Sequence, residues 1–96
     1  MPNYQEAKVY KLVSNYTDKI YIGSTTQNLA VKKAGHVRDY KNWLDGIHSY
    51  YCCFEIVKHN DFNIILLLNH PCNNKSELQA KLHEYIINND CINKYI

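Results

Sequence analysis

The chain has 96 residues, which suffice for one hydrophobic core but not for a second folded unit, so a single domain spanning residues 1–96 is expected. A hydrophobic content of 46% with 21% charged residues excludes the highly charged class of disordered chains. The formal net charge of +2 is too small to indicate a nucleic-acid partner by itself.

Two features indicate an intracellular protein. No apolar run approaches the roughly 18–20 residues that span a bilayer, and the N-terminus lacks the basic and apolar regions of a signal peptide. The four cysteines show no CxxC spacing, so buried free thiols are expected in place of a zinc site. Neither a membrane segment nor a structural metal is predicted.

The N-terminal half predicts a hairpin followed by a helix. Residues 8–13 and 19–22 alternate polar and apolar side chains, which is typical of strands. Gly23 is expected to end the second strand, and the hydroxyls of residues 24–27 suit the cap of a helix. Apolar residues then recur near the helical period from Leu29 until Gly46, which predicts a helix end.

The C-terminal half predicts a short helix, a strand and a longer helix. Residues 49–60 are interpreted as a buried helix with Tyr50, Phe54 and Val57 on one side. The continuous apolar run of residues 62–68 predicts a central strand covered on both faces. Residues 75–89 follow an amphipathic helical pattern that Ser76 is expected to cap. The order β, β, α, α, β, α predicts a small α+β layer structure.

The spacing of particular residues resembles that of the GIY-YIG nuclease family over nearly the whole chain. Tyr10 matches the tyrosine of the first family tripeptide, and residues 21–23, Tyr-Ile-Gly, match the second in full. Leu29, Lys32 and His36 match a helix that in the family carries arginine and histidine one turn apart. Residues 75–86 and Asn93 resemble the helix of the metal-binding glutamate and the closing segment.

This resemblance implies a three-stranded antiparallel sheet with flanking helices and hydrolysis of DNA phosphodiester bonds with one divalent ion, Mg²⁺ or Mn²⁺. Tyrosines help to activate water in this family, the arginine stabilises phosphate, and the glutamate holds the metal. The catalytic candidates here are Tyr10, Tyr21, Lys32 and His36. The substrate-binding candidates are Lys19, Gly23, Lys33, Arg38, Lys41 and Asn93.

Two substitutions break the family chemistry within this pattern. Lys32 stands at the arginine position, where a point charge replaces a planar fork that binds phosphate in a bidentate manner. Leu82 stands at the glutamate position and offers no oxygen ligand to a hard cation. A register shifted by two residues would bring Glu84 there but would displace the neighbouring matches. No metal ligand is therefore assigned, and impaired or lost catalysis is expected.

Three functions stay open at this point. The leading hypothesis is a GIY-YIG-type domain with impaired cleavage that retains DNA binding through the basic helix, where Tyr40 and Trp43 alternate with the cations. The second is an active nuclease that uses Lys32 and a rebuilt metal site. The third is a scaffold that binds protein through exposed tyrosines.

Overall fold

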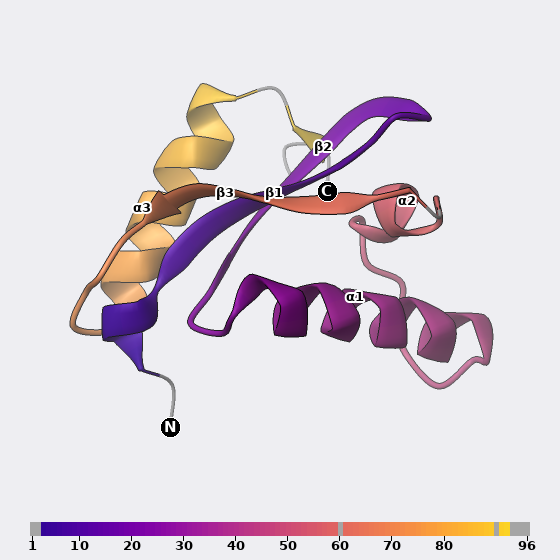
Figure 1. Cartoon of the computed structure of the whole chain (residues 1–96), viewed down its shortest axis with the longest axis horizontal. Coiled ribbons are helices and arrows are strands. Elements are labelled where there is room, and N and C mark those ends of the chain that lie inside the picture. The colour runs from indigo at the N-terminus through magenta and orange to yellow at the C-terminus, as the bar shows by residue number, and fades with distance from the viewer. Residues whose placement is uncertain (1–2, 60, 90, 93–96) are drawn as a thin grey trace.

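The computed structural model describes residues 3–59, 61–89 and 91–92, and its elements follow the predicted order (Figure 1). A short 3-10 turn that sequence patterns did not predict precedes the first strand. The elements are η1 (Tyr4–Glu6), β1 (Lys8–Ser14), β2 (Thr17–Thr25), α1 (Leu29–Leu44), α2 (Phe54–Val57), β3 (Asn63–Asn69) and α3 (Lys75–Asn88).

The three strands form one antiparallel sheet in the order β2-β1-β3, which confirms the α+β class. The prediction of a central strand at residues 62–68 is wrong, because β1 is central and β3 lies at the edge. Ile65 and Leu66 of β3 are 39% and 43% exposed, so the strand is not covered on both faces. The apolar run reflects partial contact with both layers of helices.

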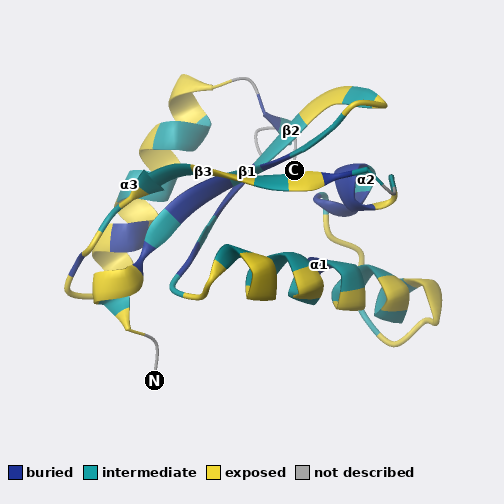
Figure 2. Cartoon of the chain, viewed as in Figure 1, coloured by how far each residue is buried: buried dark blue, intermediate teal, exposed yellow. Residues whose placement is uncertain are grey.

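Alternation along the strands separates two cores on opposite faces of the sheet. Tyr10 and Leu12 of β1 pack with α1 and α2, whereas their neighbour Val9 packs with Ile22 and α3. Figure 2 shows the most buried segments on the central strand, which lies between the layers of helices, and on α2. The sheet therefore has one face toward α1 and α2 and another toward α3.

Local signals at the ends of the helices differ from the predictions. Gly23 does not end β2, which continues to Thr25. Asn28 caps α1 by accepting the N–H of Ala30, and Asn74 caps α3 by accepting the N–H of Glu77, so Ser76 is not the cap. An asparagine before the first turn satisfies these free N–H groups as well as a hydroxyl does. Gly46 follows α1 with a φ of 78°, as the predicted helix end requires.

The helix predicted for residues 49–60 is real but much shorter. Only Phe54–Val57 are helical, and Tyr50 is exposed while Phe54 and Val57 are buried. All four cysteines are free, three of them buried and Cys52 half-buried, as expected. Among the described residues, no helix combines the length and apolar character needed to cross a membrane.

Candidate functional site: a buried tyrosine–histidine group

Three elements bring Tyr10, Tyr21 and His36 to the same face of the sheet. Tyr10 and Leu12 are two residues apart on β1 and share that face, and Leu12 pairs directly with Tyr21 of β2. His36 is the buried residue of α1, the helix that packs on this face. The residue spacing noted in the sequence thus corresponds to a spatial cluster, which we name the Tyr10–His36 group.

The centre of the group is a short hydrogen bond between side chains. The Tyr10 hydroxyl lies 2.8 Å from Nε2 of His36, and these residues are 1% and 7% exposed. The ring of Tyr21 meets the His36 ring edge to face, with centroids 6.2 Å apart. Both tyrosines therefore surround one imidazole that is almost removed from solvent.

Cys53 completes the group on the other side of the imidazole, and sequence reasoning missed it. Its Sγ lies 3.8 Å from Nδ1 of His36, just before α2 begins. The tautomer of the His36 ring decides which of these two contacts it donates and which it accepts. Nothing in the sequence distinguished Cys53 from a simple core cysteine.

Gly23 is part of this site for a steric reason. A Cβ atom built at position 23 would lie 2.5 Å from the Tyr10 hydroxyl and 2.7 Å from its Cζ atom. Tyr10 and Gly23 pair across β1 and β2, so the phenol lies directly over the glycine backbone. The glycine of the Tyr-Ile-Gly tripeptide thus provides space for the tyrosine of the neighbouring strand.

We expect Gly23→Ala to displace Tyr10 from His36 and to lower the free energy of unfolding by about 1–3 kcal/mol, as overpacking does. Urea denaturation measures the stability, and the NMR shifts of the His36 ring report the displacement. Gly35→Ala is the matched control, because a Cβ there meets only Nη2 of Arg38 at 3.7 Å. A Gly23→Ala protein as stable as the parent, with an unchanged His36 ring, would refute the steric role.

Burial sets the protonation states of the group. It raises the pKa of Tyr10 and of Tyr21 well above the ordinary value, and it raises the pKa of the Cys53 thiol to about 12. Burial, with a smaller contribution from Lys32, lowers the pKa of His36 to about 4. Near neutral pH the group is an uncharged hydrogen-bonded unit, so the isolated protein holds no phenolate or thiolate base there.

Two charged residues of α1 act on the group from its border. Lys32, one turn before His36, favours the neutral imidazole, whereas Asp39, one turn after it, favours the charged form. The Asp39 carboxylate lies 3.9 Å from Nε of Arg38. Lys32 is thus close enough to influence the pKa of His36, and Asp39 is a second such residue that the sequence analysis overlooked.

The remaining substrate-binding candidates do not converge on the group. Lys19 forms an ion pair with Glu55 at 3.4 Å, and the ammonium of Lys33 lies 5.2 Å from the centre of the Phe62 ring. Arg38 and Lys41 are exposed on α1. Asn93 lies outside the described residues. Of these candidates, Arg38 has a side chain that is 73% exposed, and Lys41 is exposed beside it on α1.

Leu82 lies on the opposite side of the sheet from the Tyr10–His36 group. Its side chain packs with Val9 and Ile22 in the core beneath α3. Among residues 3–59, 61–89 and 91–92, no three His, Cys, Asp or Glu side chains are placed to hold a metal ion. The phenols, imidazole and thiol of the group also do not fit Mg²⁺, which prefers oxygen ligands such as carboxylates. The divalent ion that the resemblance implies therefore has no suitable set of ligands among these residues.

The fold is thus a three-stranded α+β sandwich whose α1 face carries a neutral Tyr–His–Cys cluster bordered by one lysine. Comparison with known proteins adds no relative, because no family model, no curated protein and no solved structure matches the chain.

Proposed function

We propose that the chain is an intracellular DNA-binding domain of the GIY-YIG type whose phosphodiester hydrolysis is impaired or lost. The observation that supports it best is the contact of Tyr10, Tyr21, Gly23 and His36 on one face of the sheet. These are the positions through which the sequence resembles that family. The meeting of these residues, which are far apart in the sequence, supports a functional site of that type.

The impairment follows from the chemistry that surrounds the group. Hydrolysis of a phosphodiester needs an activated water and a way to stabilise charge on the phosphate oxygens. Burial keeps both phenols protonated, and the cation that acts on His36 is Lys32, which stands in place of an arginine fork. Loss of one preorganised donor costs on the order of 10²–10³ in rate in well-studied sites.

We assign DNA contact to the exposed cations of α1, and we no longer include the aromatic residues that alternate with them in the sequence. Tyr40 and Trp43 pack against Phe54, with ring centroids 5.5 and 5.7 Å away, so they belong to the core and not to a stacking surface. Arg38 and Lys41 remain exposed. Binding of this kind is directed at the phosphate backbone and is not selective for sequence.

Salt dependence tests the binding half of the proposal. Anisotropy of a labelled random duplex should show affinity that falls steeply with salt, and Arg38→Gln with Lys41→Gln should reduce the slope of log K against log salt by about one per residue. Lys81→Gln is the matched control, because this lysine of α3 lies 3.0 Å from Glu84 in an ion pair. Absence of binding at low salt would contradict the proposal.

Cleavage of supercoiled DNA with millimolar Mg²⁺ or Mn²⁺ tests the other half. We expect no nicking above background by the parent chain. Robust nicking at low protein concentration that Tyr21→Phe abolishes would overturn the impaired-enzyme proposal in favour of an active nuclease.

A protein-binding scaffold is the second candidate, and one surface favours it. Four large apolar side chains are exposed near the end of α1 and in the loop after it, namely Leu44, Ile47, Tyr50 and Tyr51. A cluster of this kind is typical of protein interaction sites. Absence of DNA binding at low salt, together with a stable fold, would favour this function.

A further inference from the structure

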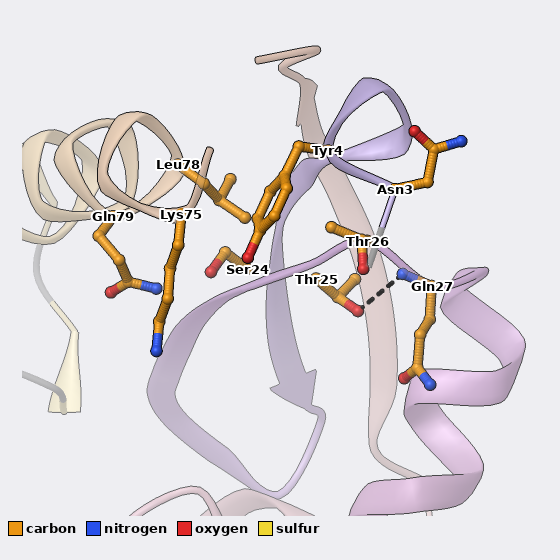
Figure 3. Close-up of a pocket in the computed structure, with 9 residues that line it drawn as sticks. All are labelled: Asn3, Tyr4, Ser24, Thr25, Thr26, Gln27, Lys75, Leu78 and Gln79. Atoms are coloured by element: carbon orange, nitrogen blue, oxygen red, sulfur yellow. Dashed lines mark hydrogen bonds between the residues drawn. The ribbon is translucent and has the colours of Figure 1, made fainter. Parts of the chain in front are cut away.

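A second site lies away from the Tyr10–His36 group, where the end of β2 meets the start of α3. A cavity of about 730 Å³ opens there between η1, residues 24–27 and α3 (Figure 3). Ser24 pairs with Val9 of β1 and so belongs to the face of the sheet that α3 covers. This volume lies in the range of roughly 300–1,000 Å³ that small organic ligands occupy.

The charge of the lining selects an anion. Lys75 is the only charged residue that lines the cavity, and no Asp or Glu does so within the described chain. Its ammonium forms no ion pair with a described residue, unlike Lys81, which is paired with Glu84. An anionic group in the cavity would therefore meet an unpaired cation without competition from a lining carboxylate.

Several neutral donors of the lining are also available to a ligand. Among the described residues, the hydroxyls of Ser24 and Thr26 and the amide of Gln79 have no hydrogen-bond partner, whereas Thr25 accepts the N–H of Gln27. Figure 3 shows Lys75 and Gln79 extending in the same direction from α3, with Tyr4 between them and the residues after β2. Hydroxyl and amide donors of this kind suit phosphate oxygens and the hydroxyls of a sugar.

One wall of the cavity is apolar and held in place. Tyr4 packs on the buried cluster of Ala7, Cys72 and Leu78, and Leu78 itself lines the cavity. The backbone carbonyl of Tyr4 accepts the N–H groups of Ala7 and Cys72 at 3.2 and 2.9 Å. Leu78 is 4% exposed, so the partly buried ring of Tyr4 is the apolar surface on which a flat heterocycle would stack.

We propose that this cavity binds a nucleoside monophosphate, with its phosphate at Lys75, its sugar at the free hydroxyls and its base on the ring of Tyr4. Inorganic phosphate alone is too small for the cavity and leaves the apolar wall uncovered. Both a free nucleotide and the 5′-phosphorylated terminal nucleotide of a DNA strand present this chemistry. The site goes beyond the proposed DNA contact of α1, because neither Arg38 nor Lys41 lines it and its only charged residue belongs to α3.

Titration calorimetry with adenosine 5′-monophosphate, adenosine and inorganic phosphate tests the site. We expect the monophosphate to bind most tightly, and Lys75→Gln to weaken it about tenfold or more, because a charged hydrogen bond is lost. Lys81→Gln is the control of equal charge and should leave the affinity unchanged. Equal binding of adenosine and its monophosphate, no effect of Lys75→Gln, or no binding at millimolar ligand would each overturn the proposal.

Competition distinguishes the two sources of the ligand. A 5′-phosphorylated oligonucleotide that displaces the monophosphate, while its unphosphorylated form does not, identifies the terminal nucleotide of a strand. Failure of both oligonucleotides to displace it identifies the free nucleotide. Lys75→Gln should leave affinity for circular duplex DNA unchanged, so failure of this site and failure of the DNA contact on α1 are separate results.

Discussion

Replacing Phe54 by alanine should lower the free energy of unfolding by about 3–5 kcal/mol, the range for a large aromatic side chain removed from a core. Phe54 is 1% exposed and begins α2. Its ring contacts Tyr40, Trp43, Tyr50 and Tyr51, with centroid distances between 5.5 and 5.8 Å. A cavity at this point removes the packing that joins α1, α2 and the loop before α2.

The change should also reach the Tyr10–His36 group, because Cys53 precedes Phe54 directly and contacts the His36 ring. Denaturant unfolding measures the loss of stability, and the imidazole NMR signals of His36 report the site. Ile87→Ala is the control, since that apolar side chain is exposed on α3 and its loss should cost less than about 1 kcal/mol. A loss below about 1 kcal/mol for Phe54→Ala would contradict the central role of this ring.

The parts of the fold that depend on local periodicity could be predicted from the sequence. Period-two alternation identified the hairpin, and the four-residue spacing of Lys32 and His36 placed both on one side of α1. These features are set by the backbone geometry of single elements, so they need no knowledge of tertiary contacts.

Features that depend on the order of strands and on packing between layers were missed. The apolar run of β3 has the composition of a central strand. The sequence of a single strand, however, does not show whether other strands pair with it on one side or on both. Leu82 was assigned to the metal-binding position of the family, yet α3 packs on the face of the sheet opposite the hairpin tyrosines, beside Val9. Cys53 and Asp39 lack a motif and became visible only through their proximity to His36.

The stability of the protein should fall by about 2 kcal/mol between about pH 7.5 and pH 5, because His36 is buried in its neutral form. Its pKa is lowered to about 4 in the folded chain, against 6.5 as the ordinary value. The unfolded chain therefore binds more protons than the folded chain in this window. The neutral His36 side chain contributes its full stabilisation only above about pH 6.5, and this contribution is lost progressively as the pH falls toward 4.

The surroundings of the imidazole explain why it resists protonation. Tyr10, Tyr21 and Cys53 are uncharged and exclude water. Lys32 adds a repulsive positive charge, which the smaller effect of Asp39 offsets only in part. The lowered pKa values of the carboxyls of Asp61 and Glu55 place their titration below the pH window that is compared. His36 should thus dominate the change between the two pH values.

Chemical denaturation at the two pH values measures this difference in parent and variant chains. His36→Gln should nearly abolish the difference in unfolding free energy between the two pH values. His83→Gln, at an exposed position of α3, should leave that difference unchanged. A parent protein equally stable at both pH values, or one whose pH dependence survives His36→Gln, would show that the imidazole is not held neutral by the fold. Burial of the same group raises the pKa of Tyr10 and keeps its phenol protonated near neutral pH, so this result bears on the proposed loss of hydrolysis as well.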